Sequence, residues 1–433
     1  MKDKIENITL DEFHHSVNIP LLKKQLSFAI ENSLFWKEWF KDIDIKNFDV
    51  HADFHRLPLC DKADILNDQI KTPPFGNLLS VDTNRVARLH RTSGTTNQPF
   101  LVLLTENDIK NTVLVGTRAF RCSGVTPDDI VVHCLNYCMW SGGITDHQCL
   151  EGTGAMVIPF GVGNSKYLIQ TIKRIHPTAI SCTPSYLGRL EELLIDEFKM
   201  QPRDLGLKIG LFGGELGMQD PGYRLSIEEK WGIQCIDANY GLSEVLSIIG
   251  SECSFKRGLH YHAQGILMPE LVDQEMNNRP LEKGSSGELV LTCLRREAQP
   301  LFRYRTHDII EIVDTDMCEC GREDFLFKIL GRTDDMIVVK GVNFFPSSIQ
   351  GVLCKFNNLF SGEYRIILES GIISVLQLEI ELLKSVKMED LSGIKKHIQD
   401  IIKSEHSVKV EIEFVSYGTI PKSENKMKRV VKV

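Results

Sequence analysis

The sequence predicts an α/β protein with a large first domain and a small α+β domain at its end. Short apolar runs alternate with helical patterns between residues 85 and 215, and a strand-rich section covers residues 286–311. After residue 333 the pattern restarts as a small α+β unit. Strands that alternate with helices are typical of sheets with parallel pairings. We therefore expect two domains, at residues 1–333 and 334–433.

Length and composition limit the classes of function. A chain of 433 residues is too long for one core, and 42% apolar and 25% charged residues are ordinary for a globular protein. The net charge of −8 argues against a general nucleic-acid binder. No apolar signal core or 18-residue apolar run is present, so we expect a cytoplasmic protein with no membrane partner. Its 12 cysteines are expected to be thiols or metal ligands and not a disulfide framework.

Apolar periodicity locates the elements of the first domain. Residues 1–80 have a helical pattern, which is clearest over Ile19–Trp39. Further on, we expect strands at Ile130–Leu135, Ala155–Pro159, Ala179–Cys182, Lys208–Phe212, Gln234–Asp237 and Gly287–Thr292, and a helix over Tyr167–Ile175.

The second domain has its own order of elements. A helix is expected to begin near Pro346, with Ser347 and Gln350 at capping-box spacing. The other expected elements are a strand at Met336–Val339, a hairpin over Ile366–Leu382 around Gly371, a helix at Met388–Ser404 and a strand at Val408–Val415.

The segment Arg91–Pro99 is the most informative motif. Five small hydroxyl or glycine residues, Thr92–Thr96, lie between the strand-like runs Val86–His90 and Phe100–Leu104. Such a loop exposes backbone N–H groups and hydroxyls, which suit polyphosphate oxygens. It is not a Walker A loop, and on its own a Ser/Thr/Gly-rich turn between strands is usually only a hairpin loop.

Four more motifs follow in order. They are Tyr240–Glu244 (YGLSE), Tyr304–Asp308 (YRTHD), Gly331–Ile337 (GRTDDMI) and the tail Ile420–Arg429. Each is weak alone, but in this order and spacing they resemble the core motifs of the adenylate-forming superfamily, which contains acyl-CoA synthetases, adenylation domains and luciferases. The resemblance runs from about residue 85 to the last ten residues.

Three segments narrow the resemblance to the phenylacetate–CoA ligase branch: Arg296–Thr306 (REAQPLFRYRT), Cys182–Tyr186 (CTPSY) and Gly341–Pro346 (GVNFFP). The resemblance implies a large multi-sheet adenylate-forming domain, with a helical start, and a small mobile C-terminal lid. It also implies an AMP-forming acid–thiol ligase. Such an enzyme uses ATP to turn a carboxylic acid into an acyl-adenylate, and then passes the acyl group to a thiol, most commonly coenzyme A.

The resemblance assigns roles residue by residue. Glu244 would hold Mg²⁺, Asp308 would bind the ribose hydroxyls, and Arg305 would support the loop that carries Asp308. A lysine of the tail would act in adenylation: Lys426, with Lys428 as the runner-up. The residues implied to bind the nucleotide are Thr92, Ser93, Gly94, Thr95, Thr96, Gly214, Glu215, Asn239, Tyr240, Gly241, Ser243, Asp308 and Arg332.

One departure from the family pattern affects the phosphate loop. Such a loop usually ends in Gly-Lys-Pro, but here it ends in Asn97-Gln98-Pro99, which removes a cation. Triphosphate binding would then be weaker unless Arg91 compensates. The hinge of the small domain is expected at Asp334 or Asp335.

The acid pocket is expected to draw on Asn136–Gly143 and Phe212–Gly214. Tyr137, Met139 and Trp140 would make it apolar and suited to an aromatic acid, although these side chains could equally be ordinary core. His147 could polarise the carboxylate, and no acidic residue clearly waits for an amino group unless Asp146, Asp237 or Glu215 reaches in. The residues implied to bind the acid are Tyr137, Trp140, Gly142, Phe212 and Gly213.

A separate group of residues suggests a metal. Cys253, His260, Cys318 and Cys320 could complete a tetrahedral Cys₃His site, with His262 as the alternative nitrogen ligand. Some relatives in the branch carry zinc at such positions. Four protein ligands would make Zn²⁺ structural; the alternative is a set of unrelated buried thiols.

Two rival functions remain open at this stage. The enzyme could load a carrier-protein phosphopantetheine instead of coenzyme A, or the chain could be a non-catalytic nucleotide binder. Asn97-Gln98 favours the second rival, whereas Glu244, Asp308 and Lys426 argue against it. A homodimer is compatible with the sequence, and the acid is not identified by it.

Overall fold

The structure is a computed structural model in which the chain forms two compact units. One contains Met1–Gly214 and Ile233–Ile329, and the other contains Glu215–Gly232 and Leu330–Val433. The predicted two domains, divided at residue 333, place Glu215–Gly232 in the first domain, whereas the structure groups this segment with the second unit. The domain boundary at residue 333 stays a prediction. The residues described are 14–44, 47–49, 53–92, 99–215, 217–340, 342–346, 348–356, 359–368, 373–387, 391–420 and 429–432.

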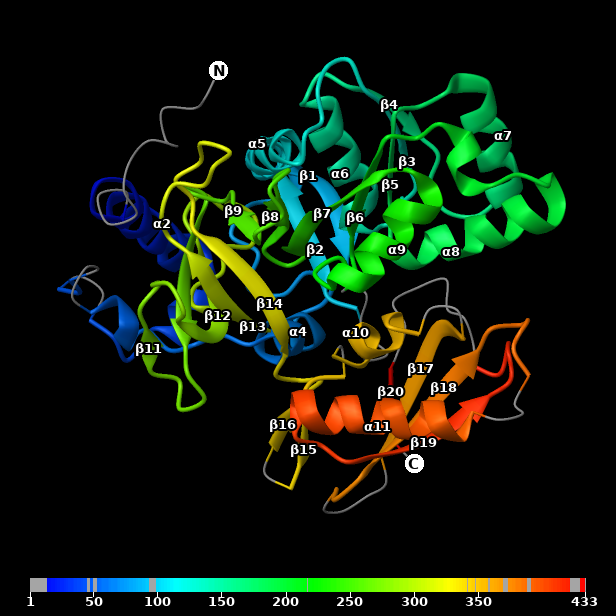
Figure 1. The fold of residues 1–433 in the computed structure, drawn as a ribbon. Coiled ribbons are helices and arrows are strands. Elements are labelled where there is room, and N and C mark those ends of the chain that lie inside the picture. The colour runs from blue at the N-terminus through cyan, green and yellow to red at the C-terminus, as the bar shows by residue number, and fades with distance from the viewer. Residues whose placement is uncertain are drawn as a thin grey trace. The chain divides into compact units, whose positions relative to one another are not determined.

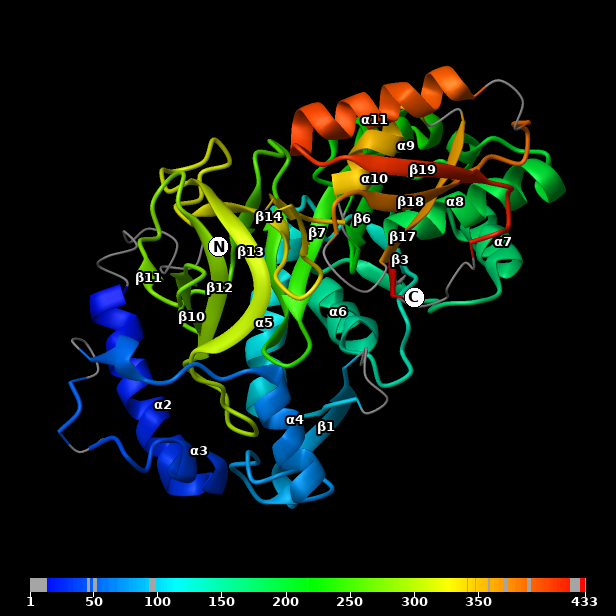
Figure 2. The ribbon, with the colours of Figure 1, turned by 90° about the horizontal axis from the view of Figure 1, so that it is seen from below.

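The described part of the chain begins with helices, as predicted, but the expected helix over Ile19–Trp39 is split in two (Figure 2). Ser33 has an extended backbone, and its side chain accepts a hydrogen bond from the backbone N–H of Trp36. A serine in this role ends one helix and caps the next. The helices are α2 (Ile19–Asn32), α3 (Leu34–Trp39) and α4 (Lys62–Lys71).

A twelve-stranded sheet dominates the first unit (Figure 1). Its strand order is β11-β10-β12-β13-β14-β9-β8-β7-β6-β5-β3-β4, and β1 and β2 form a separate antiparallel pair. The strands are β1 (Val86–Arg91), β2 (Leu101–Thr105), β3 (Ile130–His133), β4 (Met156–Pro159), β5 (Ala179–Cys182), β6 (Ile209–Gly213), β7 (Gln234–Leu242), β8 (Leu246–Glu252), β9 (Leu259–Tyr261), β10 (Leu267–Val272), β11 (Asn278–Arg279), β12 (Ser286–Cys293), β13 (Tyr304–Asp314) and β14 (Leu326–Arg332).

The five strands from β3 to β7 are parallel, which confirms the predicted α/β pattern. The chain leaves β3 toward β4 at the edge, and then returns across the sheet through β5, β6 and β7. Right-handed crossovers therefore place α6 on one face, and α7 and α8 on the other. Ligands bind outside the carboxyl ends of strands at such a reversal. The helices of this half are α5 (Glu106–Cys122), α6 (Ser141–Glu151), α7 (Ser165–Ile175) and α8 (Pro184–Leu193).

The antiparallel half includes β13, whose residues alternate between buried and partly exposed positions. Successive side chains of a strand point to opposite faces, so Tyr304, Thr306 and Asp308 share the buried face. Arg305 and His307 lie on the other face. The burial pattern thus separates the predicted ribose carboxylate from the basic residues beside it.

The second unit is built on a small sheet with the order β19-β18-β17-β20, along which α11 lies (Figure 1). The antiparallel pair β17 and β18 confirms the predicted hairpin, although Gly371 lies outside the described residues, as does Ser347. The elements are α9 (Pro221–Trp231), α10 (Ser348–Cys354), α11 (Ser392–His406), β15 (Ile337–Val339), β16 (Val342–Phe344), β17 (Phe360–Leu368), β18 (Leu376–Leu382), β19 (Val410–Val415) and β20 (Val430–Lys432).

Two predictions from composition can be compared with this fold. Every cysteine whose side chain is described is a free thiol, as expected. Among the described helices, none has the length and apolar character that crossing a bilayer requires.

Candidate active site

Three predicted site segments of the first unit lie at the carboxyl ends of the parallel strands. Asn136–Gly143 follows β3, Gly213 and Gly214 end β6, and Asn239–Glu244 covers the end of β7 and the residues after it. β3 and β6 both pair with β5, and β7 pairs with β6. The acid-pocket and nucleotide segments are therefore neighbours at one edge of the sheet.

Two of these glycines are required by close backbone approach. A Cβ atom on Gly241 would lie 2.1 Å from the carbonyl oxygen of Ser247. A Cβ atom on Gly213 would lie 2.6 Å from Cβ of Asn239. Neither position has room for a larger residue, because the facing atoms belong to the backbone or its first side-chain carbon.

A hydrogen bond joins the predicted adenine and ribose residues. The Tyr240 hydroxyl donates to Oδ2 of Asp308 at 2.7 Å, and both residues are buried. The backbone N–H of Asp308 in turn donates to Oγ1 of Thr306 at 3.0 Å. Tyr240 also packs against Phe327 in a T-shaped arrangement, with ring centres 5.5 Å apart. These contacts hold the Asp308 carboxylate in one direction.

Glu244, the predicted Mg²⁺ ligand, is paired with a lysine that the sequence reasoning missed. Nζ of Lys62 lies 2.5 Å from Oε1 of Glu244. The Glu244 side chain is 7% exposed, whereas that of Lys62 is 38% exposed. Lys62 is the first residue of α4, far away in the sequence, and no motif around it indicated this contact.

The start of α4 is attached to β13 by the backbone. The N–H of Cys60 donates to the carbonyl of Arg303 at 3.0 Å, and the N–H of Arg305 donates to the carbonyl of Cys60 at 2.9 Å. The Arg303 guanidinium also donates to the carbonyl of Leu57 at 2.8 Å. The segment before α4 therefore pairs with the start of β13, near Asp308.

An ion pair between Asp61 and His307 adds to this attachment. Nε2 of His307 lies 2.9 Å from Oδ2 of Asp61. This hydrogen bond lowers the pKa of Asp61 to about 2 and raises the pKa of His307. His307 has a φ of +62°, a left-handed conformation in which non-glycine residues are uncommon. Arg305 forms two hydrogen bonds to the Glu288 carboxylate, at 3.1 and 2.7 Å.

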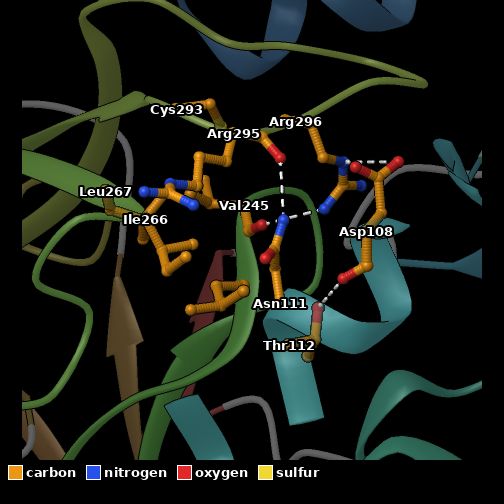
Figure 3. A pocket seen from close by; sticks show the side chains of 10 residues that line it. Asp108, Asn111, Thr112, Val245, Ile266, Leu267, Cys293, Arg295 and Arg296 are labelled. Atoms are coloured by element: carbon orange, nitrogen blue, oxygen red, sulfur yellow. Dashed lines mark hydrogen bonds and ion pairs between the residues drawn. The ribbon is translucent and has the colours of Figure 1, made fainter. Parts of the chain in front are cut away.

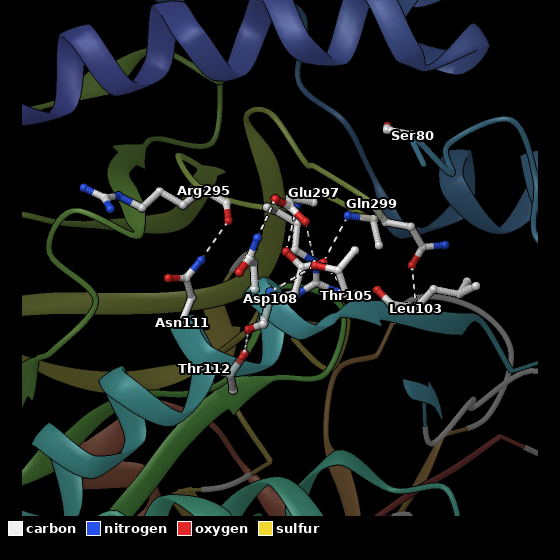
Figure 4. Close-up of polar contacts among 12 residues, drawn as sticks. Ser80, Leu103, Thr105, Asp108, Asn111, Thr112, Arg295, Glu297 and Gln299 are labelled. Atoms are coloured by element: carbon white, nitrogen blue, oxygen red, sulfur yellow. Dashed lines mark hydrogen bonds and ion pairs between the residues drawn. The ribbon is translucent and has the colours of Figure 1, made fainter. Parts of the chain in front are cut away.

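Arg296 and Asp108 support Val245, the residue that follows Glu244 (Figure 3). The buried Arg296 guanidinium donates to the carbonyl of Val245 at 3.1 Å, and its Nε lies 3.8 Å from Oδ2 of Asp108. The backbone N–H of Glu297 donates to Asp108 at 2.8 Å (Figure 4). Asp108, Val245 and Arg296 help to line a small pocket between α5 and the Cys293–Arg296 segment. The motif that begins at Arg296 therefore holds the Glu244 turn in place.

His133, at the end of β3, orders the acid-pocket segment and was not predicted. Its Nε2 lies 3.1 and 3.0 Å from the carbonyls of Gly142 and Gly143, and its Nδ1 lies 3.1 Å from Oγ of Ser181. Burial lowers its pKa to about 4, so the ring is neutral near pH 7. Because carbonyls only accept hydrogen bonds, Nε2 carries the proton and the Ser181 hydroxyl donates to Nδ1.

The aromatic residues of the predicted acid pocket have polar neighbours. The Tyr137 hydroxyl lies 3.0 Å from Nδ1 of His147, whose Nε2 lies 3.1 Å from Glu151. The Arg91 guanidinium lies 5.8 Å from the centre of the Trp140 ring, where cation–π attraction holds it. Phe212, also predicted for this pocket, is buried at the end of β6.

Two further contacts join the acid-pocket segment to the nucleotide segment. The hydroxyl oxygens of Ser141 and Ser243 lie 2.7 Å apart. Asp146 accepts hydrogen bonds from Asn239 and from Ser247. Its complete burial raises its pKa well above the usual value. Asp146 therefore orients Asn239.

Thr92 closes the base of the predicted phosphate loop. The Thr92 N–H donates to the carbonyl of Phe100 at 3.0 Å, and its hydroxyl accepts from the N–H of Phe100 at 3.1 Å. The flanking strands β1 and β2 are antiparallel, which confirms the predicted strand–loop–strand. The predicted residues that lie outside the described ones are Ser93, Gly94, Thr95, Thr96, Lys426 and Lys428.

Two predicted nucleotide residues belong to the second unit. Arg332 forms two hydrogen bonds with the Asp334 carboxylate, at 2.8 and 2.9 Å. Glu215 is the first residue of that unit.

The four predicted zinc ligands of the first unit come together. One ligand atom from each of Cys253, His260, Cys318 and Cys320 lies within 4.8 Å of all the others. The sulfurs of Cys253 and Cys318 are 3.9 Å apart, and that of Cys320 is 3.4 Å from Nε2 of His260. His262 is not in this cluster; its Nε2 lies 2.9 Å from Oγ of Ser251.

Known protein families and relatives match most or all of this chain. A family model described as AMP-binding enzyme matches residues 49–292, and one described as AMP-binding enzyme C-terminal domain matches residues 341–432. The phenylacetate–coenzyme A ligase of Escherichia coli is 32% identical over 99% of this chain and 96% of its own length. That of Thermus thermophilus is 30% identical over 95% of this chain and 94% of its own length.

Solved structures of a CoA ligase are also similar to this chain. A crystal structure of 2-hydroxyisobutyryl-CoA ligase in the postadenylation state, in complex with 2-HIB-AMP, is similar with a TM-score of 0.89 at 26% identity. It covers 99% of this chain, which spans 91% of that one. The same enzyme in complex with 2-HIB-AMP and CoA, in the thioesterification state, is similar with a TM-score of 0.71.

Proposed function

Since the chain belongs to the AMP-binding enzyme family, in the phenylacetate–CoA ligase branch, we propose that its acid substrate is an aromatic carboxylic acid of the phenylacetate type. Members of this branch are AMP-forming acid–thiol ligases. The reaction of this chain is ATP-dependent activation of a carboxylic acid to an acyl-adenylate, followed by transfer of the acyl group to coenzyme A. Carrier-protein loading is not favoured, because the curated relatives are coenzyme A ligases.

The hydrogen bond between Tyr240 and Asp308 carries the assignment of the nucleotide site. A carboxylate that is held in one direction is a suitable acceptor for the two ribose hydroxyls. The Tyr240 ring would lie against the adenine, beside Gly214. We assign Asp308 to the ribose on this basis.

Glu244 is the proposed Mg²⁺ ligand. Magnesium in phosphate-transfer sites is usually held by one or two carboxylates together with substrate phosphates. A buried carboxylate that already attracts a cation suits that role. When bound, Mg²⁺ would neutralise phosphate charge as the acid attacks the α-phosphorus.

The aromatic side chains after β3 support an aromatic acid. Tyr137 is half-buried beside His147, and Trp140 lies under the Arg91 guanidinium. Aromatic rings form an apolar wall, and they pack against a flat aromatic substrate by stacking or by edge-to-face contact. The Tyr137 hydroxyl adds one polar point to that wall.

Lys426 is the proposed adenylation lysine, with Lys428 as the alternative. Its positive charge would stabilise the negative charge that builds up between the carboxylate and the α-phosphate. We further propose that a swing of the small domain about Asp334 or Asp335 separates adenylation from thioester formation.

ATP–pyrophosphate exchange across a panel of acids tests this function. The panel contains phenylacetate, benzoate, a medium-chain fatty acid and 2-hydroxyisobutyrate, and thioester formation with coenzyme A is measured beside it. We expect exchange and thioester with phenylacetate, and loss of exchange in Lys426→Ala. Lys403→Ala, on the exposed side of α11, is the control.

Several outcomes would contradict parts of this proposal. Exchange with 2-hydroxyisobutyrate alone would refute the aromatic acid and leave the reaction class unchanged. If Lys428→Ala lost ATP–pyrophosphate exchange and Lys426→Ala kept it, Lys428 would be the adenylation lysine.

We also propose a structural Zn²⁺ at Cys253, His260, Cys318 and Cys320. Tetrahedral zinc with Zn–S of about 2.3 Å and Zn–N of about 2.0 Å places sulfurs roughly 3.8 Å apart, and sulfur and nitrogen roughly 3.5 Å apart. The observed separations of 3.9 and 3.4 Å fit these values. Nδ1 of His260 lies 3.8 Å from Oδ2 of Asp324, which would orient the ring.

A further inference from the structure

The ion pair between Lys62 and Glu244 has two unequal members. The Glu244 carboxylate is buried at the end of the β7 segment, whereas the Lys62 ammonium, 2.5 Å away, is carried on a long side chain that is partly exposed. A buried carboxylate is costly without a cation, so this ammonium stabilises Glu244 when no nucleotide is bound. Binding of Mg²⁺ to Glu244 would place a second, stronger cation at the same oxygen atoms.

We propose that Lys62 is a phosphate-binding residue, which holds Glu244 in the empty site and moves to the β- and γ-phosphates when Mg²⁺ and ATP bind. This inference rests on the proposed function of Glu244. The ligand recognised is a polyphosphate, either the end of ATP or the pyrophosphate that leaves.

Charge favours this movement. The Lys62 ammonium would be repelled by Mg²⁺ held at Glu244, and the nearest new anion would be the polyphosphate that accompanies the metal. A lysine ammonium is a compact point charge on a flexible four-carbon chain, so it can change partners without movement of the backbone. The exchange therefore needs no change in α4.

Two observations concern the supply of cations for the predicted phosphate loop. The loop has Asn97-Gln98 where a lysine is usual. Arg91, the residue that was expected to compensate, lies over the Trp140 ring. Lys62 is a cation that the structure places directly at the proposed metal carboxylate.

A purely structural role for the ion pair is the alternative. However, the start of α4 is already attached to β13 through the backbone of Cys60, and to His307 through Asp61. The Asp61 side chain also caps α4 by accepting from the N–H of Ala63. The position of α4 therefore does not depend on Lys62.

The two half-reactions distinguish these roles. The first uses ATP and releases pyrophosphate, whereas the second starts from the acyl-adenylate, which has no β- or γ-phosphate. We would measure ATP–pyrophosphate exchange, and separately thioester formation from pre-formed phenylacetyl-adenylate and coenzyme A. The variants are Lys62→Met, which keeps the length of the side chain, Lys62→Arg, which keeps the charge, and the control Lys71→Met at the exposed end of α4.

We expect Lys62→Met to raise the KM for ATP and pyrophosphate by about 10- to 100-fold, the range for loss of one hydrogen bond to a charged group. Thioester formation from the adenylate should stay within about twofold of wild type. Lys62→Arg should recover part of the loss, and Lys71→Met should change neither half-reaction. Equal losses in both half-reactions of Lys62→Met, or no loss in either, would overturn the proposal.

Calorimetric titration of the intact protein gives a second measurement. Removal of the ammonium should weaken the binding of inorganic pyrophosphate with Mg²⁺, while Mg²⁺ alone should bind Glu244 more tightly. Pyrophosphate affinity equal to that of wild type would refute the proposal even if catalysis fell. If wild type makes no thioester from any acid, the proposed function fails, but this titration still decides the role of Lys62.

Discussion

The first unit contains two buried polar groups, the cysteine cluster and Glu244, which differ in how many protein ligands they could offer to a metal ion. At the cysteine cluster, one potential ligand atom from each of four side chains lies within 4.8 Å of the others, so the proposed zinc site would need no small-molecule ligand. At Glu244, one carboxylate is paired with the ammonium of Lys62, whose long side chain is partly exposed. A closed set of ligands suits a permanent ion, whereas an incomplete set suits a metal that arrives and leaves with its nucleotide.

Cys318→Ser tests the proposed zinc site and should have the largest effect on stability. Structural zinc contributes about 10–16 kcal/mol of apparent folding free energy in small zinc domains, so loss of one thiolate should cost more than about 4 kcal/mol. We expect loss of bound zinc by elemental analysis and a lower midpoint of denaturant unfolding. Cys138→Ser, at an exposed thiol outside the cluster, should retain both. Full zinc content in Cys318→Ser would show that the cluster is not the metal site.

Arg296→Met tests the support of the turn that carries Glu244. The buried guanidinium faces Asp108 and the carbonyl of Val245, and removal of one member of a buried ion pair costs about 3 kcal/mol. The free energy of unfolding should fall by that amount, with a higher KM for ATP because the Glu244 turn loosens. Arg295→Met, at the exposed neighbouring residue, is the matched control. Equal stability of the two variants would refute this role.

Asp308→Asn tests the ribose site and should mainly affect activity. Loss of a charged acceptor for the ribose hydroxyls should cost about 2 kcal/mol, or roughly a 30-fold fall in kcat/KM for ATP. Steady-state kinetics with varied ATP would measure this fall. Asp316→Asn, an exposed carboxylate after the same strand, should be close to wild type. A change in the KM for the acid alone would contradict the assignment.

The ion pair between Asp61 and His307 should give the smallest effect, and one that depends on pH. The pKa of Asp61 is lowered to about 2, so its contribution is present above its unfolded pKa of about 4 and is lost as pH falls toward 2. The pKa of His307 is raised, so its contribution is present below about pH 6.5 and is lost as pH rises through the raised value. The coupling should therefore be largest between about pH 4 and 6.5.

A double-mutant cycle with Asp61→Asn and His307→Gln measures that coupling through the free energy of unfolding at several pH values. Both side chains are partly exposed, so solvent screening should keep it below about 1 kcal/mol. A coupling that grows above pH 8 would contradict the assigned pair.

Local sequence patterns predicted the elements well, because hydrophobic periodicity and turn chemistry act over a few residues. The strands that became β3, β5 and β6, and the helix α7, were predicted within a few residues of their observed bounds. The split at Ser33 was missed, because a serine within an apolar helical pattern indicates a cap only where the backbone becomes extended.

The sequence by itself determined the family, the order of the motifs and the residue types of the four-ligand cluster, since all of these are read along the chain. Only the tertiary structure decided which distant side chains meet. It paired Lys62 with Glu244, joined Tyr240 to Asp308 and brought His260, not His262, to the cysteines. The physical reason is that these contacts depend on how β7, β9, β13 and α4 pack together, and residues far apart in the sequence leave no periodic signal of such packing.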